Sequence, residues 1–324
     1  MFIEQGIKQE NRFWKYIVGS LLIILASTIG QVPLVIAVFA KSFAKGNGIP
    51  TNTDDLMKTL DSNLTLFLIM LSFVFALIGF YFVVKYLHKQ TLLEITTSRK
   101  KVDWSRILFS FSLWTFFTIA STAILYFTSP ENFVFNFKPI PFLILLIISV
   151  IMIPFQTSCE EYVFRGYLMQ GFGGLSLNKW FPLIMTSVIF GGMHIFNPEV
   201  AKMGYIVLVF YIGTGFLLGI MTLMDEGMEL ALGFHAANNL IGALLVSTDW
   251  SVFQTNSILK DISDPSAGID IILPVIIIYP LLLFIFSKKY DWSNWQEKLT
   301  GNIQLKNEND SNPINENDYD SKLS

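Results

Sequence analysis

Charged side chains are scarce in this sequence. Asp, Glu, Lys and Arg together make up 15% of its 324 residues, whereas a typical soluble domain holds about 25%. The deficit comes from long apolar blocks with almost no charge, which is typical of membrane-spanning segments. The formal net charge of −3 also excludes the broad basic surface by which proteins bind nucleic acid.

Cysteine is almost absent as well. The single residue Cys159 excludes an internal disulfide framework and any metal site built from several thiolates. No cleavable signal peptide is evident, because the first apolar run, residues 16–40, is longer than the roughly 7–15 residues of a signal core. We therefore expect that run to be a retained helix.

Long apolar runs fill the rest of the chain. A helix needs about 20 residues to cross a bilayer core, and this criterion predicts an all-α, polytopic integral membrane protein with about eight transmembrane helices. We expect the two shortest segments to pack in the interior, around a polar cavity. The predicted spans are residues 16–40, 64–84, 107–128, 141–168, 181–196, 204–224, 230–247 and 270–287.

The distribution of positive charge predicts the orientation. Most of the 22 Lys and Arg residues fall in segments on one side if the N-terminus is inside, and positive charge favours the cytoplasmic side. We therefore predict a multi-pass protein, in the plasma membrane, with both termini cytoplasmic. The lipid bilayer is its predicted surrounding, and the sequence does not define an oligomeric state.

Composition divides the chain into three parts. Residues 1–140 hold N-terminal transmembrane helices without a motif, and residues 141–289 hold the segments that carry polar motifs. Residues 290–324 are rich in Asn and Asp and end in a strongly polar stretch. Such a segment buries too little apolar surface to fold, so we predict a disordered cytoplasmic tail.

Four ionisable residues lie within or at the end of apolar segments. Glu160 and Glu161 close the run 141–159, and His194 and His235 lie inside the runs 181–196 and 230–247. A charged side chain in a bilayer costs roughly 2.5–3.5 kcal/mol on insertion scales. We expect such groups to be tolerated because they meet and act together.

The first motif pairs carboxylates with a cation. On a helix, Glu161 and Arg165 are four residues apart and share a face, while Glu160 is rotated by about 100°. One carboxylate is then held by the arginine, and the other is free for proton transfer. The alternative is that the helix ends at Cys159 and the charged residues form an interfacial salt bridge.

Two further motifs carry the histidines. Phe190 precedes His194 by one helical turn, and His235 precedes Asn239 by the same spacing. His235 and Asn239 on one face could stabilise a developing oxyanion. The alternative for each is structural: a hydrogen-bonded core histidine, and a polar contact between helices.

In this order, the three motifs resemble those of the CPBP family, also called Abi or type II CaaX prenyl endopeptidases. That family's pattern is Glu-Glu-x-x-x-Arg, then Phe-x-x-x-His, then His-x-x-x-Asn or His-x-x-x-Asp, on successive transmembrane helices. The resemblance covers about residues 140–250. It implies an intramembrane endopeptidase with eight helices, whose cavity meets the inner leaflet and admits a membrane-associated peptide or protein substrate.

The resemblance also implies roles for individual residues. It assigns the essential glutamate to Glu160, which with His194 would activate a water molecule. The partner glutamate is Glu161, held by Arg165. His235 and Asn239 would hold the oxyanion. These six residues are the predicted catalytic site.

Whether a metal takes part is left open by the sequence. Members of the family are commonly described as metalloproteases, and Zn²⁺ could be held by Glu160, His194 and His235 with an open position for water. The alternative is a metal-free glutamate peptidase. We favour it because the cation Arg165 beside Glu161 opposes binding of a dication.

Two other functions use similar residues. Buried Glu, His and Arg also mark proton-coupled transporters, although we find no inverted repeat of the kind such proteins contain. The second alternative is a catalytically silent protein that binds a membrane partner or confers bacteriocin immunity.

Overall fold

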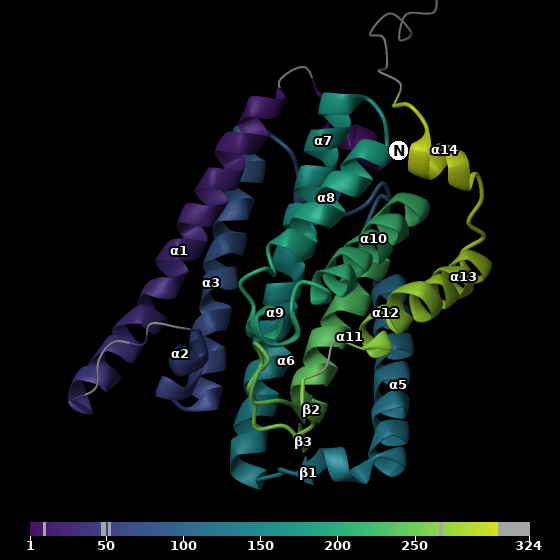
Figure 1. Ribbon diagram of the computed structural model, residues 1–324. Helices are drawn as coiled ribbons and strands as arrows, with labels where there is room; N and C mark the ends of the chain where they lie inside the picture. Colours follow the sequence, from purple (N-terminus) through teal and green to yellow (C-terminus); the bar gives the residue numbers. More distant parts are fainter. Residues whose placement is uncertain (9–10, 47–49, 51–52, 266–267, 304–324) are drawn as a thin grey trace, which may run out of the picture.

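The computed structural model of this chain describes residues 1–8, 11–46, 50, 53–265 and 268–303. Helices account for nearly all of its secondary structure and run as a bundle (Figure 1). Six of them are long and apolar enough to cross a membrane. The predicted class, an all-α integral membrane protein with several spans, is therefore confirmed.

Each predicted span coincides with a helix. Three of these helices contain a π-helical turn. The turn η2 (Val83–Leu87) follows α3, and η4 (Tyr162–Leu168) lies between α6 and α7 (Met169–Ser176). The turn η5 (Pro274–Ile278) joins α12 (Ile269–Leu273) to α13. The main helices are α1 (Phe13–Ala44), α3 (Ser62–Phe82), α5 (Trp104–Thr128), α6 (Pro139–Glu161), α8 (Trp180–Gly192), α10 (Val207–Asp225), α11 (Glu229–Leu245) and α13 (Tyr279–Lys289).

The predicted number of eight spans is not confirmed, because α8 and α11 are short. They have 13 and 17 residues, which at 1.5 Å per residue gives about 20 and 25 Å, less than a 30 Å hydrocarbon core. Both helices pack extensively against longer neighbours, α8 against α10 and α11 against α5 and α6. Helix α11 is mostly buried, as we expected of a short segment, whereas α8 leaves Trp180, Ile184 and Val188 exposed on one face.

The predicted span 181–196 is too long at its end. Helix α8 stops at Gly192, and His194 lies in the turn that follows. Gly191 and Gly192 weaken the helix at this point, since glycine is a poor helix former and favours helix ends. Gly191 is also required for packing, because a Cβ atom there would lie 2.8 Å from the backbone nitrogen of Ile212 in α10.

Short elements close the ends of the bundle. A small sheet, ordered β1-β3-β2, pairs Phe133 with Asp261 in antiparallel register and Val246 with Leu259 in parallel register. It ties the connection before α6 to the end of α11, at the end of the bundle opposite the N-terminus (Figure 1). The remaining elements are η1 (Ile3–Gly6), α2 (Thr53–Thr59), α4 (Leu92–Thr96), η3 (Pro130–Asn132), β1 (Phe133–Phe135), α9 (Pro198–Met203), β2 (Val246–Ser247), β3 (Leu259–Asp261) and α14 (Trp295–Thr300).

A buried ionic network fixes the turn between α10 and α11. The Arg99 guanidinium contacts Asp225 at 3.0 Å and Glu229 at 3.1 Å, and Arg106 also pairs with Asp225. Trp292 donates its ring N–H to the same aspartate at 3.2 Å. Because Glu229 is the first residue of α11, the network sets the position of the helix that carries His235.

The two ends of the described chain lie at the same end of the bundle. Lys179 donates to the carbonyl oxygen of Glu297 at 3.1 Å and lies 3.0 Å from the Met1 sulfur, and the N-terminus stands beside α14 in Figure 1. The two terminal segments of the described chain therefore pack side by side.

The prediction of a disordered tail from residue 290 is wrong for residues 290–303. This segment contains α14, and Trp292 and Ile303 are buried against the bundle. Leu299 packs there too. These apolar side chains supply the surface that the polar stretch further on lacks. The remainder of the predicted tail, residues 304–324, lies outside the described residues.

His88 joins three segments next to the N-terminal end of α1. Its ring nitrogens contact the Asn11 side-chain oxygen at 3.1 Å and the Tyr167 hydroxyl at 2.9 Å. The imidazole is buried, and this burial, aided by the nearby charge of Lys15, lowers the pKa of His88 to about 4. Because burial disfavours the imidazolium, the folded protein holds this side chain neutral at physiological pH.

We therefore predict that the stability of the fold falls as pH decreases from about 6.5 to 4. Unfolded chains take up a proton at His88 below about 6.5, whereas the folded protein resists uptake until about 4. The stabilisation that neutral His88 contributes is therefore fully present above about pH 6.5, and it is lost as the pH falls to about 4. Thermal unfolding in detergent at several pH values checks this.

The variant His88→Gln is the control, since glutamine can hydrogen bond but does not titrate. The difference in melting temperature between parent and variant should change across the window. An unchanged difference would contradict the assignment.

Candidate active site

The two adjacent glutamates end α6 and open a π-helical turn. Pro154 lies six residues before Glu160 and removes one backbone donor from the helix, and the i,i+5 pattern begins at Tyr162. Such π turns are rare and often occur at functional sites. The Glu161 side chain is fully buried, whereas that of Glu160 is 17% exposed. The local helix therefore gives neighbouring carboxylates different environments.

Arg165 neutralises the buried carboxylate, as the i,i+4 spacing predicts. Its Nη1 lies 3.2 Å from Glu161 Oε1, and its Nη2 donates to the Gly215 carbonyl oxygen of α10 at 3.3 Å. The guanidinium also stacks over the Phe190 ring, with 4.2 Å between the group and the ring centroid. The arginine thus links α6 and η4 to both α8 and α10.

His235 of α11 lies between the two glutamates. Its Nδ1 is 2.6 Å from Glu161 Oε1, and its Nε2 is 3.4 Å from Glu160 Oε2. A carboxylate only accepts hydrogen bonds, so the short contact requires a proton on Nδ1. With the proton on Nδ1, the lone pair of Nε2 is free to accept a hydrogen bond from the Asn239 amide, whose Nδ2 lies 3.4 Å away. One imidazole and two carboxyl groups therefore meet in one largely buried cluster.

Asn239 lies beside the same imidazole nitrogen. Its Nδ2 is 3.4 Å from His235 Nε2 and donates to Gln156 Oε1 at 2.9 Å. Gln156 in turn donates from Nε2 to Glu160 Oε1 at 2.6 Å. Gln156 is not among the site residues predicted from the sequence, although its spacing of four residues before Glu160 on one helix could have identified it.

His194 approaches from the turn after α8. Its Nδ1 donates to the Phe190 carbonyl oxygen at 2.8 Å, because a carbonyl oxygen only accepts. The neutral ring therefore has its lone pair on Nε2. Tyr211 of α10 stacks on the imidazole at 4.1 Å between ring centroids, and Glu160 is close enough to interact with it electrostatically.

The structure thus brings five of the six predicted residues into direct contact. Within the described residues no hydrogen bond joins His194 to this group. Instead the Phe190 ring stands between the two imidazoles, 4.9 Å from His194 and 6.0 Å from His235 between centroids. A water molecule or a substrate atom would be needed to connect His194 with Glu160.

The donor set does not fit a preformed metal site. Among the residues that the structure describes, no group of three or more His, Cys, Asp or Glu side chains is arranged to hold a metal ion. Glu161 is already engaged by Arg165 and His235, and the guanidinium places a positive charge in the cluster. The zinc site of Glu160, His194 and His235 stays a prediction.

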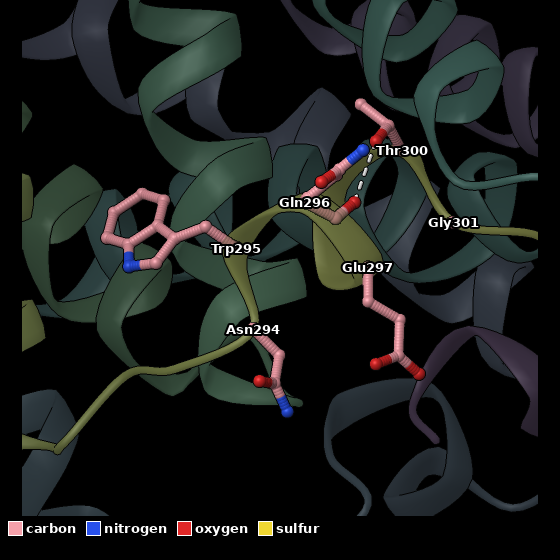
Figure 2. A pocket seen from close by; sticks show the side chains of 6 residues that line it. All are labelled: Asn294, Trp295, Gln296, Glu297, Thr300 and Gly301. Carbon is pink, nitrogen blue, oxygen red and sulfur yellow. Dashed lines mark hydrogen bonds between the residues drawn. The ribbon is translucent and has the colours of Figure 1, made fainter.

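A surface hollow of about 520 Å³ lies elsewhere, at α14. Figure 2 shows its lining residues, with the Thr300 hydroxyl donating to the Gln296 carbonyl oxygen at 2.7 Å. It contains one carboxylate, Glu297, and none of the predicted catalytic residues. Because its lining offers no base paired with a histidine, we do not associate it with hydrolysis.

Comparison with known proteins agrees with the motif analysis. Residues 139–241 match the model of the family described as type II CAAX prenyl endopeptidase Rce1-like. This segment contains all six predicted catalytic residues and confirms the family resemblance. It supports a CAAX-type intramembrane protease-like role.

A Bacillus subtilis (strain 168) protein, named Uncharacterized protein YyaK, is 28% identical over 248 residues, which cover 76% of this chain and 82% of that protein. No solved structure matches the chain. The similarity to the Bacillus protein extends well beyond the family segment, so the N-terminal helices or the C-terminal part are shared as well.

We predict that Arg165→Met destabilises the protein by about 3–5 kcal/mol, because it leaves the Glu161 carboxylate buried without its cation. Thermal or denaturant unfolding in detergent measures this change. The double variant Arg165→Met/Glu161→Gln should recover much of the loss, since it removes both charges. Losses that simply add in the double variant would show that the two side chains are not coupled.

Proposed function

We propose that this protein is an intramembrane endopeptidase that hydrolyses a peptide bond of a membrane-associated substrate, in the manner of a CAAX-type prenyl protease. The observation that carries the proposal is the pairing of two carboxyl groups on one imidazole. Glu161 and His235 are buried, while Glu160 is partly open and able to meet a water molecule. Differing environments of this kind separate the tasks of neighbouring carboxylates.

Glu160 is the proposed general base, together with His194. The water molecule donates a proton to Glu160 as its oxygen attacks the scissile carbonyl carbon. The free Nε2 lone pair of His194 accepts a hydrogen bond from the other water proton and orients the attack. Glu160 then returns its proton to the leaving amine as the carbon–nitrogen bond breaks. General acid–base catalysis of this type contributes typically 10²–10⁴-fold.

His235 and Asn239 are the proposed oxyanion donors. Their Nε2 and Nδ2 atoms lie 3.4 Å apart, so one oxygen atom can accept from both. Nε2 donates when the ring is protonated, and the Glu161 carboxylate at Nδ1 stabilises that charge. Asn239 has two amide hydrogens, and only one is used by Gln156. In a site with little water, such fixed donors act strongly on a developing negative charge.

The alternative within this function is a metalloprotease. Zn²⁺ bound by Glu160, His194 and His235 would supply Lewis-acid activation of the water molecule. The contacts of Glu161 with both Arg165 and His235 support the metal-free glutamate mechanism. Metal analysis of the purified protein, with cleavage measured in the presence of a chelator, separates the two.

The expected substrate is a peptide attached to a membrane, because the cluster lies among helices that are embedded in one. We propose the plasma membrane, with both termini cytoplasmic. The supporting observations are the bias of Lys and Arg along the sequence and the shared location of the two ends of the described chain.

We predict that Glu160→Ala and His194→Ala each lower kcat/KM by about 10²–10⁴-fold, the usual contribution of a general base or its partner. The assay measures cleavage of a fluorogenic, lipid-anchored CaaX-type peptide by full-length protein in proteoliposomes. Glu131→Ala, which removes an exposed glutamate near β1, serves as the control and should match the parent.

Cleavage by both variants at the parental rate would refute the proposal. Proton flux that depends on Glu160, without cleavage, would favour the transporter. Biological activity retained by Glu160→Gln and Asn239→Ala would favour a silent binding or immunity protein.

A further inference from the structure

A continuous chain of hydrogen bonds reaches Glu160 from a tryptophan on another helix. Trp114 Nε1 donates to Asn238 Oδ1 at 3.1 Å, and Asn238 Nδ2 donates to Asn239 Oδ1 at 3.0 Å. Asn239 Nδ2 then donates to Gln156 Oε1 at 2.9 Å, and Gln156 Nε2 donates to Glu160 Oε1 at 2.6 Å. The chain crosses α5, α11 and α6.

The direction of this chain is determined by its two ends. An indole N–H can only donate, and an ionised carboxylate can only accept. Each of the three carboxamides between them must therefore present its oxygen toward Trp114 and its nitrogen toward Glu160. Hydrogen bonds aligned in this way polarise one another, and the strongest effect falls on the charged acceptor at the end.

Buried, well-packed side chains hold the hydrogen-bonded residues in place. The Trp114 ring is buried and packs against Phe117 and Phe234, with centroids 4.9 and 4.5 Å apart. Gln156 is also buried, with 4% of its surface exposed. Asn238, three residues after His235 on α11, connects Trp114 to Asn239. A buried amide with fixed partners on both sides has one orientation.

We infer that Gln156 is a positioning residue that holds the Glu160 carboxylate for catalysis, with its amide orientation set by Trp114, Asn238 and Asn239. The inference rests on the proposed function of Glu160. Gln156 occupies Oε1 of the carboxylate, so Oε2 is the oxygen left to face His235 and the attacking water. The structure thereby assigns the base to one particular carboxylate oxygen.

The variant Gln156→Met tests this, because methionine has nearly the same shape and offers no amide. We expect kcat to fall about 10–100-fold, the scale set by small misplacement of a catalytic group, and KM to change less than about twofold, since substrate binding is untouched. Combined with Glu160→Gln, it should cause no further loss. Ser149→Ala, a buried polar change on α6 outside the chain, should leave kcat unchanged.

Trp114→Phe provides a second test that does not touch α6. It keeps an aromatic ring and removes only the donor that starts the chain. We expect a fall in kcat of about 2–5-fold with KM constant, because the loss of one remote donor is only partly transmitted along the amides. If Gln156→Met does not fold, this variant and Asn238→Ala decide the matter.

The results separate the inference from the function on which it rests. Parental kcat in Gln156→Met and Trp114→Phe, with Glu160→Ala inactive, overturns the positioning role and leaves the peptidase intact. Rapid cleavage by Glu160→Ala overturns the peptidase mechanism itself. A loss of kcat with constant KM, absent in the Glu160→Gln background, supports the inference.

Discussion

The polar interior of this protein depends on the contact between Arg165 and Glu161. Both side chains are fully buried, and a charge without a partner in such surroundings is strongly unfavourable. The pair is useful because each member has further contacts: the guanidinium binds Gly215 and stacks on Phe190, and the carboxylate holds His235. One ion pair therefore fixes the relative positions of α6, α8, α10 and α11.

The short helices follow from the same constraint. Helices α8 and α11 are less than a bilayer thickness in length, and the polar side chains that they carry, such as Thr186, Ser187 and His235, are buried against neighbouring helices. Backbone groups beyond a helix end can exist at such depth only where protein or water satisfies them. The turn that carries His194 meets this condition through its contacts with Phe190 and Tyr211.

The charge network at Arg99 and the amide chain from Trp114 act on the same helix from two sides. Arg99 binds Glu229 at the start of α11, and Trp114 binds Asn238 two turns further on. Between these contacts lies His235, whose ring has little freedom left. The contacts of His235 with the two glutamates are thus supported by groups distributed over much of the bundle.

The sequence by itself determined the membrane class, the helical segments and the three motifs. These features depend on composition and on spacing within one helix, as with Glu161 and Arg165. Only the tertiary structure decided the end of α8 before His194, the order in residues 290–303, and the partners of His235. It also revealed that Gln156 and Asn238 join Trp114 to Glu160. Their amides acquire a direction only when α5, α6 and α11 are packed together, because a hydrogen bond between helices leaves no periodic trace along the chain.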